Sequence, residues 1–327
     1  MSDNPNSTIV PGESNLNVFM TGGSDPVGLA LTRWLVAAGH RVIGMTDGSE
    51  GASRVREAGG LPVFADPARA GEIRGMLVMA KANVVIHAAP MIANAVPFAA
   101  WDYTPEQLTE ETCALIEAVR EAEVQVERVL HFSYALVYAL AGDTSAPAGE
   151  GDELAAPDDP FLAAALETER LIQDELSAVV LRAGYIYGPD SEALRALDAR
   201  LKAGAPIPTG SASAANWVYQ DDLLAAAGLA LEQSGPAVFN IVDDQPTAPA
   251  EFVRYLATAQ GLNPPASPPR LLGGLFSDRL VIDRLDLGAR ASNAHARQQL
   301  GWKPAFPTYE DGLENVLRSW RAEMSQT

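Results

Sequence analysis

A glycine-rich segment near the start of this 327-residue chain could bind a ligand that carries phosphate groups. An apolar run ends at Met20 and leads into Thr21-Gly22-Gly23-Ser24-Asp25-Pro26-Val27-Gly28, where a helical pattern begins. Glycines in such a turn let the backbone approach a pyrophosphate, which lies at the N-terminus of the helix. Asp47 follows about 20 residues later, the spacing at which a carboxylate meets a ribose hydroxyl. The pattern predicts a dinucleotide site that includes Gly22, Gly23, Ser24, Gly28 and Asp47.

Asp25 and Pro26 occupy the middle of this turn. Aspartate is a favoured N-cap and proline a favoured first helical residue, so the pair predicts a helix that caps itself. The Asp25 carboxylate would compete with a pyrophosphate for the same backbone donors. Two alternatives follow: dinucleotide binding is lost, or it is retained but weakened. If NAD or NADP binds, Asp47 favours NAD because its charge repels a 2′-phosphate. Asp47 could equally just start the turn Asp47-Gly48-Ser49.

The four histidines and the single cysteine are scattered, so no metal site is predicted. His87 and His131 lie within apolar runs and are expected to be hydrogen-bonded core residues rather than catalysts. Cys113 cannot form an intramolecular disulfide and is expected to be a small buried residue on a helix.

The elements that must position these residues follow an alternating pattern from Leu16 onward. Short apolar runs alternate with helical spacings, which is typical of βαβ units around a parallel sheet. The predicted fold class is α/β, a Rossmann-type doubly wound parallel sheet with a smaller C-terminal α/β substrate-binding region. The predicted strands span 17–20, 41–45, 62–64, 83–87, 129–132 and 178–181.

Changes in composition divide the chain. We predict a disordered tail at residues 1–15 and the Rossmann dinucleotide-binding domain at 16–182. Residues 183–327 have shorter elements and many prolines, which predicts a smaller substrate region. Residues 216–243 are expected to return to the Rossmann core. Residues 141–159 are rich in glycine, proline and acids and predict an exposed loop.

The formal net charge is −19, from 42 acidic and 23 basic residues. Such a surface repels phosphate backbones and anionic lipid, so nucleic acids and membranes are not expected as partners. The N-terminal segment lacks the pattern of a secretory signal and no apolar stretch is long enough to span a bilayer, which predicts a cytoplasmic protein. A small-molecule or nucleotide-type ligand and a protein partner remain as expectations.

Further motifs occur in order along the chain. His87-Ala88-Ala89 ends the fourth predicted strand and Val63-Phe64-Ala65-Asp66 ends the third. Others span 131–138, 180–189, 217–223, 238–241 and 299–304. Together with the glycine turn they resemble extended short-chain dehydrogenases/reductases, the lineage of nucleotide-sugar epimerases and dehydratases. The resemblance implies NAD(P) binding, with Asp66 facing adenine and with Ala88 and Ala89 among the cofactor-binding residues.

The same resemblance implies a catalytic set from which this chain departs. In the family a tyrosine acts as general acid/base, and a lysine four residues later on the same helix lowers its pKa. Those positions are Phe161 and Ala165 here, the family's serine position is Tyr134, and a helix asparagine falls on Leu108. No tyrosine is followed by a lysine at this spacing, so the standard chemistry is not expected. The lysines are Lys81, Lys202 and Lys303.

Two functions remain open. The first is a catalytically silent binding or regulatory protein that keeps the fold and in which nucleotide binding is weakened or lost. The second is an active NAD(P)-dependent oxidoreductase or nucleotide-sugar epimerase with a non-standard site near Tyr134, which could donate a proton or a hydrogen bond. Alternatively, the Tyr134 ring fills the space of the missing groups.

The resemblance also bears on assembly. Family members often dimerise through the helices that correspond to 104–122 and 161–176. The run Ala163-Ala164-Ala165 would suit close helix packing, so a homodimer is expected from the resemblance.

Overall fold

The structure is a computed structural model that describes residues 15–88, 103–140, 146–152, 154, 159–209, 214–268 and 287–325. The predicted tail lies outside this part of the chain except for Asn15, and so does Ala89. Within the described residues, no helix is both long enough and apolar enough to cross a membrane.

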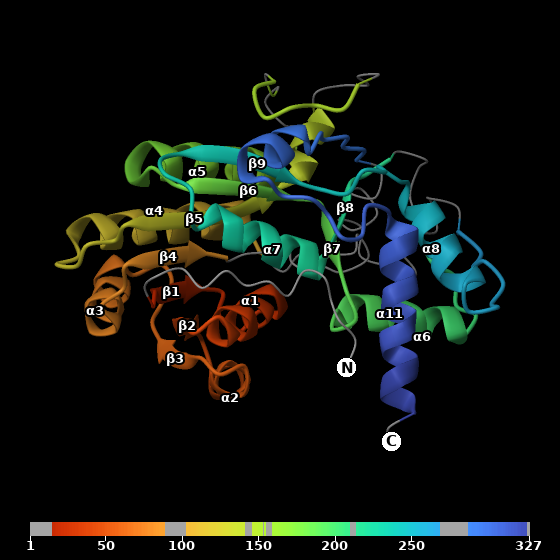
Figure 1. Cartoon of the computed structure of the whole chain (residues 1–327), viewed down its shortest axis with the longest axis horizontal. Helices are drawn as coiled ribbons and strands as arrows, with labels where there is room; N and C mark the ends of the chain where they lie inside the picture. The colour runs from red at the N-terminus through yellow and green to blue at the C-terminus, as the bar shows by residue number, and fades with distance from the viewer. Residues whose placement is uncertain are drawn as a thin grey trace.

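A seven-stranded parallel sheet forms the centre of the molecule (Figure 1). The order of its strands is β3-β2-β1-β4-β5-β6-β9. Their bounds are β1 (Asn17–Thr21), β2 (Arg41–Thr46), β3 (Leu61–Phe64), β4 (Val84–His87), β5 (Arg128–Tyr134), β6 (Val179–Ala183) and β9 (Ala237–Ile241). The six predicted strands are all present, and β9 adds a seventh at the edge beside β6.

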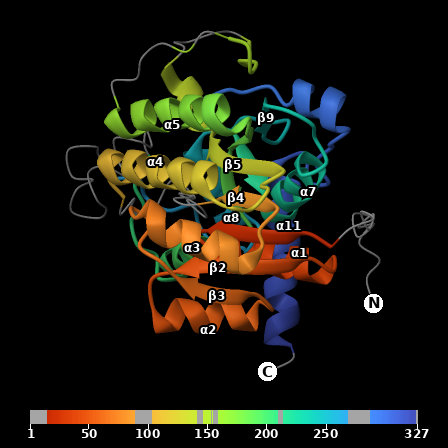
Figure 2. The same cartoon turned by 90° about the vertical axis from the view of Figure 1, so that its left-hand side faces the viewer.

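Helices cover both faces of the sheet (Figure 2). On one face lie α3 (Ala70–Ala80), α4 (Pro105–Glu121) and α5 (Pro160–Leu176), and on the other α1 (Pro26–Ala37) and α7 (Gln220–Ala230). The remaining crossover helix, α2 (Ser49–Glu57), joins β2 to β3. Because both faces are covered, a central strand such as β4 is an unbroken buried run. The Rossmann-type doubly wound fold is confirmed.

The strand order reverses at β1. The chain leaves β1 for β2 and β3 and then returns to β4 on the other side of β1. In this architecture a ligand usually lies at such a switch point, in the crevice at the carboxyl ends of the strands. The glycine turn and Ala88 follow β1 and β4, so the topology brings both to the crevice.

A smaller region is built on the carboxyl side of the sheet. Its two-stranded parallel sheet consists of β7 (Tyr185–Tyr187) and β8 (Trp217–Tyr219). A core of aromatic and aliphatic side chains joins it to neighbouring helices, including the 3₁₀ helix at Ala135–Leu140 that follows β5. The other helices of this region are α6 (Glu192–Lys202), α8 (Pro249–Thr258) and α11 (Tyr309–Met324). A short π-helix (Ala296–Leu300) packs near β9. The boundary predicted at residue 182 stays a prediction.

The expectation for Cys113 is half wrong. The residue lies on α4, but its side chain is exposed. The helix directs Thr112 and Leu115 inward, and Cys113 lies a third of a turn from Thr112 and therefore faces outward.

The predicted loop at 141–159 is also not wholly exposed. Ala148 is buried and forms a parallel bridge with Ala291, so this segment is tied to the C-terminal region. Residues 141–145, 153 and 155–158 lie outside the described part of the chain.

Candidate functional site

The glycine turn after β1 has the tight geometry that a dinucleotide cradle requires. Gly22 adopts a positive φ of 63°, and the Gly23 amide donates to the Met45 carbonyl at 3.0 Å. A β-carbon on Gly28 would lie 2.0 Å from the Gly22 carbonyl oxygen, and one on Gly23 would lie 2.6 Å from Gly44 Cα. Only glycine fits at these two positions, because the contacted atoms are backbone. The shape of the turn therefore suits the backbone approach that a pyrophosphate needs.

Asp25 is the N-cap residue of α1 and Pro26 its first residue, as predicted, but the Asp25 side chain makes no capping hydrogen bond. The expectation of a self-capped helix is wrong in this respect. Burial raises the pKa of Asp25 to about 6; Arg54 lowers it in part, and the charge of Asp47 raises it. The carboxylate thus interacts with the charges of Arg54 on α2 and Asp47 after β2, and it makes no hydrogen bond to the first amides of α1.

The other predicted cofactor residues lie along the same carboxyl edge. Asp47 directly follows β2 and is exposed. Asp66 follows β3, where its carboxylate accepts from the Ala68 amide and from Arg69 Nε, both at 3.0 Å. Ser24 lies in the glycine turn and Ala88, buried, follows β4. The fold brings these residues to one crevice, and their contacts with a cofactor stay a prediction.

Glu111 on α4 is a further carboxylate of the same crevice. Burial raises its pKa, nearby Tyr103 lowers it, and the charges of Asp66 and Asp25 raise it. These couplings place carboxylates from the β1 turn, the β3 end and α4 around one space. Sequence reasoning assigned Glu111 no role. The glycine turn has the tight geometry that a dinucleotide needs, and these carboxylates add negative charge beside it.

The four positions that depart from the family's catalytic set come together in the fold. Leu108, Tyr134, Phe161 and Ala165 belong to one apolar cluster and are 2%, 9%, 1% and 2% exposed. The rings of Tyr134 and Phe161 lie 5.7 Å apart at 59°. A buried apolar cluster thus stands where a serine, tyrosine, lysine and asparagine would form a proton-transfer site.

A pocket opens beside this cluster, between the end of β5 and the C-terminal region. The space between its lining atoms is about 420 Å³, part of which is open to solvent. It is lined by residues 134–136, 183–186, 215–216 and 289. Tyr134 is therefore part of both the pocket wall and the apolar cluster. Leu108, Phe161 and Ala165 are not among the described residues that line the pocket.

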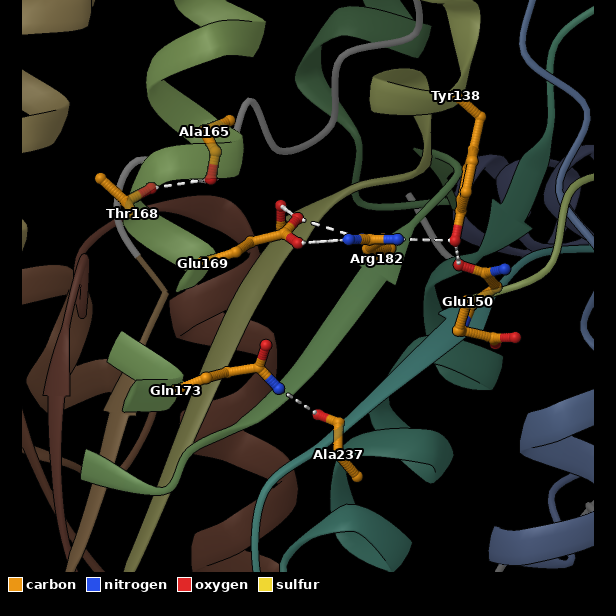
Figure 3. A network of polar contacts seen from close by, with 10 residues as sticks. Tyr138, Glu150, Ala165, Thr168, Glu169, Gln173, Arg182 and Ala237 are labelled. Carbon is orange, nitrogen blue, oxygen red and sulfur yellow. Dashed lines mark hydrogen bonds and ion pairs between the residues drawn. The ribbon is translucent and has the colours of Figure 1, made fainter. Parts of the chain in front are cut away.

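Below the pocket, a buried ion pair joins α5 to β6 (Figure 3). Arg182 donates through Nε and Nη2 to Glu169, at 3.0 and 2.7 Å to Oε2, and through Nη1 to the Tyr138 hydroxyl at 2.7 Å. Tyr138 in turn donates to Asn240 Oδ1 at 2.9 Å, and Ser133 donates to Glu169. Sequence reasoning gave this network no role, although Arg182 and Tyr138 lie in the motifs at 180–189 and 131–138. It fixes the strand end that carries Tyr134.

His87 is a hydrogen-bonded core residue, as predicted, whereas the Nδ1 atom of the buried His131 has no hydrogen-bond partner among the described residues. Thr112 donates to the Leu108 carbonyl at 2.8 Å, so it accepts from His87 Nε2 at 3.1 Å. His87 Nδ1 then accepts from Thr21 at 2.8 Å, and burial lowers the pKa of His87 to about 4. His131 stacks on His87 at 5.1 Å. In the described ranges, no group of three or more histidine, cysteine, aspartate or glutamate residues is arranged to hold a metal ion.

Solved structures share this architecture. A UDP-glucose 4-epimerase from Thermotoga maritima, with UDP-glucose, has a TM-score of 0.76 at 19% identity, over 94% of this chain and 99% of that one. The Bordetella bronchiseptica enzyme WbmG, in complex with NAD and UDP, has a TM-score of 0.72 at 19% identity, over 95% and 96%. At this level of identity the likeness concerns the fold.

Sequence comparison extends the likeness to the family. The model of the NAD dependent epimerase/dehydratase family matches residues 18–241. A 3-diazoavenalumate denitrifying reductase from a Streptomyces species is 32% identical over 320 residues, 91% of this chain and 99% of that protein. With its glycine turn at the switch point of a doubly wound sheet and a family match over most of its length, this chain belongs to the NAD dependent epimerase/dehydratase family.

Proposed function

We propose that this protein is an NADH-dependent reductase that delivers hydride to an acceptor requiring no proton. The observation that carries the proposal is the apolar cluster of Leu108, Tyr134, Phe161 and Ala165 at the family's proton-transfer positions. Reduction of a carbonyl needs a general acid for the developing alkoxide, and this cluster offers no activated one. The acceptor is therefore one whose product is neutral once hydride has arrived.

A diazonium group on a carbon atom meets this requirement, and the Streptomyces relative is named as a reductase of a diazo compound. Bound NADH would supply the hydride. The new bond forms between hydrogen and the carbon that carries nitrogen, the carbon–nitrogen bond breaks, and its electron pair leaves with N₂. The balance is one diazonium and one NADH to one C–H product, N₂ and NAD⁺, with no proton consumed.

The chain's own residues would bind and orient in this reaction. Gly22, Gly23 and Gly28 would let the backbone approach the diphosphate, and Asp47 would meet the ribose hydroxyls, which favours NADH over NADPH. Tyr134 would form a wall beside the acceptor and exclude water from it. In this proposal the Tyr134 hydroxyl takes no part in proton transfer, so Tyr134→Phe retains activity.

Isotope transfer tests the reaction. The full chain would be mixed with a benzenediazonium salt and NADH that is deuterated at the transferred position. We expect one deuterium in the benzene formed, and none when unlabelled NADH is used in D₂O. Mixtures without protein or with heat-unfolded protein measure the background. Solvent deuterium in the product, or no product above background, would contradict the proposal.

A matched glycine pair tests where the cofactor binds. Gly28→Ala places a β-carbon against the Gly22 carbonyl, whereas Gly75 on α3 has nothing within 4 Å of the added carbon. We expect Gly28→Ala to lose dinucleotide binding and turnover, and Gly75→Ala to keep both. Equal activity in the two variants would place the reaction elsewhere.

A catalytically silent nucleotide-binding protein is the second candidate. The carboxylates of Asp25 and Glu111 in the crevice favour it, because they oppose a diphosphate. Calorimetry with NAD⁺, NADH, NADP⁺ and NADPH separates the two functions. Micromolar binding of one dinucleotide without turnover of either a diazonium salt or UDP-glucose would favour the silent protein, and millimolar or absent binding of all four would exclude the reductase.

A further inference from the structure

From the walls of the pocket at Tyr134 we infer that this site takes a planar aromatic ring that carries no negative charge, and not a nucleotide sugar. The inference deepens the proposed function, since it names the substrate class of the same site. It rests on the polar groups, the charge and the aromatic walls of the pocket, which are independent of hydride transfer.

The polar side chain at the base of the pocket is already engaged. Asn216 Oδ1 accepts from the Ala291 amide at 2.6 Å, and its Nδ2 donates to the Ala291 carbonyl at 3.4 Å. A sugar buried here would bring several hydroxyls that need partners, and each hydroxyl left unpaired weakens binding. Most of the other lining residues are Ala, Leu, Ile and Gly. The pocket therefore favours a ligand with few polar atoms.

The charge of the pocket points the same way. None of the described lining residues is basic, and the chain as a whole carries a net charge of −19. A nucleoside diphosphate brings two negative charges, which proteins usually meet with arginine or lysine. A neutral or cationic ring has no such requirement.

Two tyrosines form aromatic walls that are held in place from behind. The Tyr185 ring lies 5.4 Å from Trp217, which stacks on Phe252 at 3.9 Å and 6°. Tyr134 is backed by Phe161. Because their neighbours fix both rings, a planar ligand can bind without ordering the walls, which lowers the entropic cost of binding.

Backbone completes the enclosure between these walls. A β-carbon on Gly184 would lie 2.9 Å from the Asn216 carbonyl oxygen, so the chain just before β7 passes as close to the chain just before β8 as glycine allows. This part of the lining therefore presents backbone alone. Tyr134 and Tyr185 are thus the residues we assign to substrate specificity.

Binding of neutral probes tests the inference without requiring turnover. Calorimetry on the full chain, with and without NAD⁺, would compare cinnamyl alcohol with 3-cyclohexylpropan-1-ol, which has a similar size and a puckered ring. UDP-glucose is the third probe. We expect cinnamyl alcohol to bind about tenfold more tightly than the cyclohexyl compound, and UDP-glucose to show no heat of binding.

Variants connect the binding to the two rings. Tyr134→Leu and Tyr185→Leu keep apolar bulk and remove the ring, and each should weaken cinnamyl alcohol about tenfold. Tyr255→Leu is the matched control, since it removes a partly buried ring on α8 outside this pocket. Thermal unfolding of each variant checks the fold, and the wild-type comparison of the three probes stands if a variant does not fold.

Two results would overturn the inference: UDP-glucose binding as tightly as cinnamyl alcohol, or no preference for the planar probe. Failure of the proposed function looks different, because the probes would then bind as expected while NADH and a diazonium salt give no turnover.

Discussion

At the scale of single residues, Asp25 has the largest consequence for ligand binding. It occupies the middle of the glycine turn, where its carboxylate is largely buried and shares the crevice with Asp47 and Glu111. Arg54 opposes part of this charge. Because a diphosphate adds further negative charge, the protonated form of Asp25 should bind a dinucleotide better than the ionised form.

The affinity for NAD⁺ should therefore depend on pH. The pKa of Asp25 lies at about 6. The carboxyl group therefore loses its proton as the pH increases from roughly 5 to roughly 8, and we expect the Kd for NAD⁺ to rise over this range. Asp25→Gly should bind about tenfold more tightly at the upper end and lose most of this dependence. Calorimetry across this range measures both effects. Asp174→Asn, an exposed charge change at the far end of α5, should behave like wild type; a tightening there would assign the effect to net charge.

The same residue should affect the unliganded fold. The pKa of Asp25 is about 4 in the unfolded chain and about 6 in the folded chain. At a pH between these two values, the folded state retains a proton that the unfolded state has released. Stability therefore falls as pH rises through this window. Asp25→Asn should raise the free energy of unfolding by about 2 kcal/mol above the window and by little below it. Urea unfolding at both pH values tests this, and an equal gain at both would refute it.

At the scale of elements, α5 separates what this chain has kept of the family from what it has changed. Phe161, Ala165 and Glu169 follow one another at i, i+4 spacing and are all buried. The resemblance assigns the first two positions to catalytic residues, whereas Glu169 forms a buried ion pair with Arg182 on β6. Removing one partner of this pair would leave a buried charge without compensation.

Glu169→Gln should accordingly destabilise the protein by about 3 kcal/mol, because Arg182 would lose its counter-charge in a buried site. The matched control is Glu167→Gln, two residues away, whose pair with Arg170 is exposed and should cost less than about 1 kcal/mol. Urea unfolding at neutral pH compares the two variants. Similar losses for both would show that the Glu169 pair has no special weight.

At the scale of the whole molecule, the outer surface of α4 and α5 bears on assembly. Ala165 faces the core, so it is not available for packing against another chain. The exposed acidic residues of the two helices are Glu106, Glu110, Glu117, Glu121, Glu167, Asp174 and Glu175. Arg120 and Arg170 are exposed among them and pair within the same chain. A twofold dimer through this face would bring acidic surfaces together.

Self-association through α4 and α5 should therefore depend on salt. We expect a monomer at low ionic strength and a growing dimer fraction as salt screens the carboxylates. Sedimentation velocity at low and high salt measures this. Glu110→Lys with Glu117→Lys should shift the equilibrium toward the dimer, and a dimer equally stable at all salt concentrations would disprove the argument.

The sequence by itself determined six of the seven strands of the main sheet, because alternating apolar runs and helical spacings depend on near neighbours along the chain. It also determined that no tyrosine–lysine pair exists, since that is a matter of spacing alone. Local rules were less reliable for side-chain direction: Asp25 is an N-cap residue whose carboxylate does not cap.

Only the tertiary structure decided what surrounds each candidate. It joined Leu108, Tyr134, Phe161 and Ala165 into one apolar cluster from three separate elements, and it paired Glu169 with Arg182 across two. Sequence spacing could not show these contacts because they form between elements whose relative position is set by packing and strand order. For the same reason, the pocket at Tyr134 and the engagement of Asn216 within it followed only from the folded chain.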